Sequence, residues 1–319
     1  FFKQKTAYEI YQCDWSSDVC SSDLFQGQGA ITLFDKLIQA ARLNDSGAYP
    51  YLRSHPMSTE RMADMAGRAQ QLSAAETSTP PDLVHAMMVG RARALTDLSP
   101  DAQRKLMQNA RLQTPATAKV ETTRVGALYA GVVAHMTARQ FSEAEQLLSF
   151  LRGALKGKTP ELDQVTWLAA ELNMRQGKPL DALQTLDTIS FTGSTTRAQR
   201  MLKAQAMVES QQPELARQAV ALLESWLSQH PRDGHAWDLT GQGLGLMQEP
   251  LRSLRAQAEA RAVRFDLVAA IDRLLAAQDL ARQLVSQGKL GRAQEIDASI
   301  IDTRLRQLRQ LRREQTLQR

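Results

Sequence analysis

The side chains that could bind a metal or transfer a proton are few in this 319-residue chain, and its five histidines come first. None of them is followed by glutamate, so the metalloprotease motif HExxH does not occur in this sequence. His85 and His135 fall in stretches of helical periodicity, where a structural or solvent-exposed role is expected. His55 differs, because it lies in the segment YPYLRSHPMS and the following Pro56 holds its backbone extended. Such an imidazole could supply one metal ligand, but a zinc site needs three or four.

The two cysteines, Cys13 and Cys20, lie in a segment that is not typical of natural protein sequence. Residues 1–24 can be back-translated into two stretches of a common sequencing adapter with a short index between them. We therefore expect this segment to be a disordered artefact, and we exclude it from fold reasoning. The cysteine pair then indicates neither a disulfide nor a metal site. We also expect the natural N-terminus to be lost upstream of Phe25.

The remaining composition favours a basic, wholly helical protein. The chain has 39 Lys and Arg against 34 Asp and Glu, and leaving out the two lysines and four acidic residues of 1–24 raises its net charge from +5 to +7. Arginines cluster near the C-terminus, where a solvated helix face is expected. Nucleic-acid binding would need stacking aromatics among them, and aromatics make up only 5% of the chain. No run of about 18 apolar residues occurs, so we predict no membrane span.

A repeat is visible in four segments that each place a small residue shortly after a turn. The small residues are Ala144, Ala182, Ala219 and Ser253, and the steps between them are 38, 37 and 34 residues. Tetratricopeptide units of helix–turn–helix form have a period of about 34 residues. We therefore predict an all-α fold, with a tetratricopeptide-like solenoid over residues 76–319 that ends in a capping helix. Thr79 and Pro80 are expected to open its first helix as N-cap and first helical residue.

Stacked helix pairs of this kind present a groove that binds peptide segments or partner proteins. The side chains expected to line it from the inner helices are Tyr129, Trp167, Glu171, Arg175, Asp238 and Gln242. Trp167 and Trp237 could equally be packing residues, and for Trp237 packing is the better interpretation. The GQGLG segment at 241–245 is similar to a phosphate loop. It follows no predicted strand, so we interpret its glycines as helix-packing residues.

Three parts of the chain together resemble a known family. They are LND-x-x-x-YPYLRSHPMSTERM (residues 43–62), the helical repeat units, and the ending EIDASIIDTRLRQLRQL. The family is that of periplasmic zinc metalloproteases with a C-terminal tetratricopeptide domain, the β-barrel assembly-enhancing proteases. The resemblance covers essentially residues 25–319. It implies that residues 25–75 are the helical C-terminal remnant of a zincin peptidase domain whose HExxH helix and zinc would lie upstream of Phe25.

The resemblance also implies functional roles. His55 would be a regulatory ligand that occupies the open position of the zinc, but its partner ligands are missing from this chain. The parent would be a periplasmic zinc protease of outer-membrane protein quality control. Its partners would be the outer-membrane assembly machinery or unfolded β-barrel clients, without nucleic acid. This chain is then expected to be an inactive, zinc-free protein-interaction module. The alternatives are a stand-alone non-enzymatic tetratricopeptide scaffold and a regulatory repeat protein of the cytoplasm.

Overall fold

The computed structural model describes residues 82–114, 121–189 and 195–317, together with six single helical positions before them. Those positions are Asp35, Gln39, Met62, Ala63, Ala66 and Gly67. His55, residues 1–24 and most of the segment 25–75 lie outside the described residues. The chain divides into two compact units, Phe1–Pro80 and Pro81–Arg319, and the second contains the elements discussed below.

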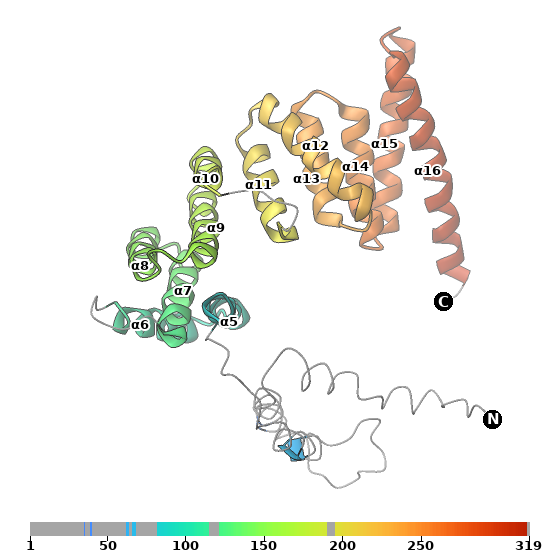
Figure 1. The fold of residues 1–319 in the computed structure, drawn as a ribbon. Coiled ribbons are helices and arrows are strands. Elements are labelled where there is room, and N and C mark those ends of the chain that lie inside the picture. Colours follow the sequence, from blue (N-terminus) through green and yellow to red (C-terminus); the bar gives the residue numbers. More distant parts are fainter. Residues whose placement is uncertain are drawn as a thin grey trace, which may run out of the picture. The chain divides into compact units, whose positions relative to one another are not determined.

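The described part of the second unit is built from helices alone, so the all-α prediction is confirmed (Figure 1). Every helix contacts the next along the chain, and α5 also packs against α7, as in a helical solenoid. The helices are α5 (Leu83–Thr96), α6 (Pro100–Leu112), α7 (Thr122–Thr137), α8 (Phe141–Ala154), α9 (Thr159–Arg175), α10 (Pro179–Leu186), α11 (Arg197–Glu209), α12 (Pro213–Gln229), α13 (Gly234–Leu246), α14 (Pro250–Val263), α15 (Leu267–Ser286) and α16 (Arg292–Leu317).

The small residues that mark the repeats are buried where paired helices cross. Ala144, Ala182 and Ala219 are fully buried on α8, α10 and α12, and Ser253 on α14 is nearly so. The Ser253 hydroxyl donates to the backbone oxygen of Gly241 at 2.7 Å, which joins α13 to α14. A Cβ on Gly241 would lie 3.3 Å from the Ser253 backbone oxygen. Helix packing therefore accounts for Gly241 of the GQGLG segment.

The first helix begins later than the sequence pattern predicted. α5 starts at Leu83, and its N-cap is Asp82, whose carboxylate accepts from the backbone N–H of His85 at 3.0 Å. The prediction of a start at Thr79 and Pro80 was wrong, and these two residues lie outside the described ones. The N-cap is provided instead by Asp82, because an aspartate carboxylate accepts readily from a free N–H of the first helical turn.

Two glycines bring α5 and α7 into backbone contact. A Cβ on Gly90 would lie 2.3 Å from the carbonyl oxygen of Gly126, and one on Gly126 would lie 2.9 Å from that of Ala86. Neither distance is tolerable, so a larger residue at either position would force the helices apart. The contact places Arg91 of α5 and Tyr129 of α7 on neighbouring faces.

Five of the turns between helices share one backbone geometry. In each turn, a single residue has a left-handed backbone conformation. The backbone N–H of the residue that follows donates to the carbonyl oxygen five positions before that following residue, at 2.9–3.1 Å. This is the Schellman ending of a helix, which favours glycine because glycine has no Cβ. Only two of the five positions hold glycine. The left-handed residues are Arg139, Gly177, Gln248, Phe265 and Gly288, with φ between 57° and 74°.

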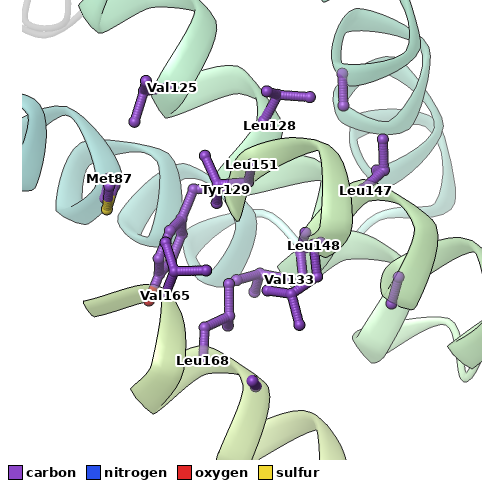
Figure 2. Packing of buried hydrophobic residues seen from close by; sticks show 14 of the residues in the cluster. Met87, Val125, Leu128, Tyr129, Val133, Leu147, Leu148, Leu151, Val165 and Leu168 are labelled. Carbon is purple, nitrogen blue, oxygen red and sulfur yellow. The ribbon is translucent and has the colours of Figure 1, made fainter. Parts of the chain in front are cut away.

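Apolar side chains between the helices form successive clusters rather than one central core. The first joins α5, α7, α8 and α9, where Met87, Tyr129, Val133 and Val165 pack together (Figure 2). A second extends from α9 to α13, and a third holds α14, α15 and α16 together. On α16 the apolar side chains fall into two groups: Ile301, Leu305 and Leu308 are buried, whereas Ile296, Ile300 and Leu311 are 43–59% exposed. No helix among the described residues is long and apolar enough to cross a membrane.

Candidate peptide-binding groove

A groove of about 730 Å³ opens between α5, α7, α9 and α11, and His235 of α13 reaches its edge. Its apolar floor is rich in methionine and includes Met88, Met174, Met201, Leu202 and Trp167. Methionine side chains are flexible and polarisable, so they adapt to ligand side chains of different shapes. The floor can therefore contact apolar side chains of several kinds and does not select a single one.

One wall of the groove contains an ion pair between two helices that are far apart in the sequence. The Arg91 guanidinium of α5 donates to both carboxylate oxygens of Glu171 on α9, at 2.7 and 3.1 Å. Both side chains are partly shielded, with 32% and 22% exposure. This two-pronged geometry is the stronger form of a carboxylate–guanidinium contact. Beside the pair lies Tyr129 of α7, and burial raises the pKa of its hydroxyl above the ordinary value.

A second network holds the groove together at α11, α12 and α13. The Asp233 carboxylate, the N-cap of α13, accepts from Arg197 Nε and Nη2 at 2.6 and 2.7 Å and from Trp226 Nε1 at 2.9 Å. It also accepts from the backbone N–H groups of His235 and Ala236 at 3.2 Å. The hydrogen bonds from Arg197, aided by those from Trp226 and Ala236, outweigh burial and lower the pKa of Asp233. The ionised carboxylate thus links three helices.

Arg175 offers a charge to a ligand. It is exposed at the end of α9, and among the described residues it has no ion-pair or hydrogen-bond partner. Three amide side chains, those of Gln164, Gln199 and Gln205, also line the groove. Gln199 Oε1 already accepts from the Thr196 backbone N–H at 2.8 Å, and Gln205 Nε2 donates to Glu209 at 2.7 Å, so each of these two amides keeps its other polar atom for a ligand. Amides can donate to and accept from the backbone of an extended chain. The groove thus combines apolar contacts, backbone-like hydrogen bonding and one accessible positive charge.

The structure brings together four of the six side chains that the sequence predicted for the groove. Tyr129, Trp167, Glu171 and Arg175 all line it. Asp238 and Gln242 do not. Asp238 on α13 is bound in an ion pair by Arg264, the C-cap of α14, and Gln242 is exposed elsewhere on α13. Trp237 is partly buried against the second cluster, and its indole N–H donates to the Pro231 carbonyl at 2.9 Å, as expected of a packing residue.

Sequence reasoning missed Arg91, Arg197 and Asp233. Asp233 had a local signal, because an aspartate just before a helix is a common N-cap. Arg91 and Arg197 had none, since their partners are 80 and 36 residues away. No sequence pattern at helical spacing identifies such a partner.

The described residues do not fit a zinc ion. No group of three or more His, Cys, Asp or Glu side chains that could hold a metal occurs among them. Glu171 and Asp233 are already bound to arginines, and the Nδ1 atom of buried His135 lies 2.7 Å from Gln140 Oε1. His55 and any ligands near it lie outside the described part of the chain.

Comparison with known proteins relates the chain to a curated protease. No family model matches the chain. Over 263 residues, which are 82% of this chain, it is 26% identical to the β-barrel assembly-enhancing protease of Yersinia pestis. The chain resembles that protease. The resemblance inferred from the LRSHP segment and the helical units is therefore confirmed. The aligned residues make up 49% of the Yersinia protein, so the chain spans about half the length of this curated relative.

Proposed function

We propose that residues 82–317 form a protein-interaction module whose groove between α5 and α11 binds an extended polypeptide segment. The observation that supports this most directly is the lining itself, in which a methionine-rich floor lies beside three glutamine amides and Arg175. An extended chain has apolar side chains for such a floor and backbone groups for the amides. Methionines that adapt to different side chains favour many segments over a single one.

The role within a larger protein follows from the resemblance. The chain would be the interaction part of a protein related to the β-barrel assembly-enhancing protease, working in the periplasm. The bound segments would then belong to unfolded outer-membrane β-barrel proteins or to the machinery that assembles them. Zinc chemistry would belong to a peptidase domain that the described residues do not include. Within this proposal the groove selects and holds a client and does not cleave it.

A direct binding measurement tests the groove. The probe is a fluorescein-labelled peptide of alternating valine, tyrosine and serine with a free C-terminal carboxylate, and the readout is its anisotropy against the full chain. Replacing Trp167 with serine removes the largest apolar contact of the floor, so we expect binding to weaken about tenfold. Met88→Ser tests the same floor at a position that is 37% exposed and can change without unfolding the helix.

The matched control is Leu180→Ser, which removes a 49%-exposed leucine of α10 that does not line the groove. Its affinity should stay within twofold of the parent, and circular dichroism should show all variants folded. Equal loss of binding in the Leu180 variant, or undiminished binding in both groove variants, would contradict the proposal.

A further inference from the structure

A second concavity, separate from the groove, lies between α15 and α16, which pack side by side (Figure 1). It has a volume of about 720 Å³ and shares no lining residue with the groove. Its apolar part is formed by Ile271 and Leu275 of α15, and Arg309, Arg312 and Arg313 of α16 surround them. Asp272 and Thr316 complete the lining. We call this concavity the arginine pocket.

The three arginines differ from Arg304, which lies on the same helix. Arg304 donates to both carboxylate oxygens of Glu259 at 2.7 Å, so its charge is neutralised within the protein. The guanidinium groups of Arg309, Arg312 and Arg313 have no ion-pair or hydrogen-bond partner among the described residues, and all three side chains are exposed. Positions three and four apart lie on one face of a helix. Three like charges on that face repel one another, and a bound anion would relieve the repulsion.

The chemistry of the pocket favours carboxylates on a peptide. Each guanidinium offers a planar pair of N–H donors that matches the two oxygens of a carboxylate. The buried Ile271 and partly buried Leu275 provide a place for an apolar side chain next to those charges. Asp272 is an exposed acceptor in the same lining, and it too has no partner among the described residues.

Asp272 argues against a purely anionic surface. A membrane of anionic headgroups presents acceptors, which the Asp272 carboxylate would oppose, whereas a peptide also presents backbone N–H donors. Nucleic acid would gain no stacking, because none of the lining side chains is aromatic. We propose that the arginine pocket binds an acidic segment of a partner protein, with an apolar side chain against Ile271 and Leu275 and flanking carboxylates on Arg309, Arg312 and Arg313.

The test uses the full chain and two labelled hexapeptides. The first has two central leucines flanked by aspartate and glutamate, and the second carries asparagine and glutamine in place of the acids. We expect the acidic peptide to bind at least about tenfold more tightly than the amide peptide, and the difference to shrink as salt rises. The double variant Arg309→Gln/Arg312→Gln should lower affinity for the acidic peptide about tenfold.

The control is Arg306→Gln, an exposed arginine of α16 that does not line the pocket. It lowers the net charge without changing the site, so binding should stay within about twofold. If Arg306→Gln lost half as much binding free energy for the acidic peptide as the double variant does, the attraction would be non-specific, and the proposal would be overturned. Vesicles containing phosphatidylglycerol form the last arm. Arginine-dependent adsorption to them without binding of the acidic peptide would assign the pocket to a membrane surface instead.

Discussion

Most charged side chains of the groove are bound within the protein. Arg91 pairs with Glu171 and Arg197 with Asp233, and each pair joins helices that are distant in the sequence. Breaking either pair would leave a partly buried charge without its partner, which is costly. These residues therefore position the groove walls rather than contact a ligand. Arg175 remains available for a ligand carboxylate.

His135 illustrates a different residue-scale effect, the burial of a titratable group. Its Nδ1 lies 2.7 Å from Gln140 Oε1, which fits an N–H donor at Nδ1, and its Nε2 is buried without a partner. Burial lowers the pKa of His135, with Arg111 adding to the effect, although the hydrogen bond to Gln140 and the charge of Glu143 oppose it. Protonation of Nε2 would place a positive charge, and an N–H group without a hydrogen-bond partner, on the buried face of α7.

The predicted consequence is a loss of stability in mild acid. Because the folded-state pKa is lowered, the unfolded chain binds the proton first once the pH falls below about 6.5, the ordinary value for histidine. The free energy of unfolding should then fall between pH 7.5 and 5.5, and His135 should account for up to about 1 kcal/mol of that fall. Urea melts at both pH values measure it. His135→Gln should show a smaller fall than the parent, whereas His85→Gln, at an exposed site, should match the parent.

At the scale of elements, the sequence predicted the repeat period and the small residues at which helices pack. It did not predict the residues at the turns between the helices. The buried small residues Ala144, Ala182 and Ala219 follow directly from the repeat spacing. The left-handed turn residues Arg139 and Gln248 could not be found, because turn signals rely on glycine or asparagine and neither occurs there. Contact between α5 and α7 through Gly90 was equally hidden, since a lone glycine in a helical pattern does not reveal which helix approaches it.

Gln248 gives a test of the turn geometry. Its φ is 62°, and its side chain is exposed, so a glycine there would remove the Cβ strain without losing a contact. Gln248→Gly should raise the free energy of unfolding by about 1 kcal/mol, measured by urea denaturation. Gln248→Ala also lacks the amide but keeps the Cβ, so it should give no gain. Equal stabilisation by both substitutions would place the effect in the lost side chain and not in the backbone.

At the scale of the whole molecule, four of the six side chains that the sequence predicted for a groove line one concavity. Tyr129, Trp167 and Glu171, taken from one inner face of the repeats, line the groove that the structure shows. Asp238 does not line it, because that side chain is bound by Arg264, the C-cap of the neighbouring helix α14. The repeat steps vary between 34 and 38 residues, so small differences in helix rotation accumulate, and equivalent positions no longer face the same way. A sequence period does not record those rotations.

The largest-scale prediction concerns proteolysis. A hydrolytic zinc needs three protein ligands and an open position for water, and the sequence has no HExxH. The described residues contain no cluster of metal donors. Within the proposal that this chain holds clients and does not cleave them, the 319-residue chain incubated with casein and zinc is expected to release no fragments above buffer, and a chelator is expected to change nothing. Zinc competition with a chromophoric chelator should give the weak binding of an isolated histidine, and His55→Ala should lower it only slightly. Casein fragments that vanish on chelation, and vanish in His55→Ala, would instead place a working metal site outside the described helices.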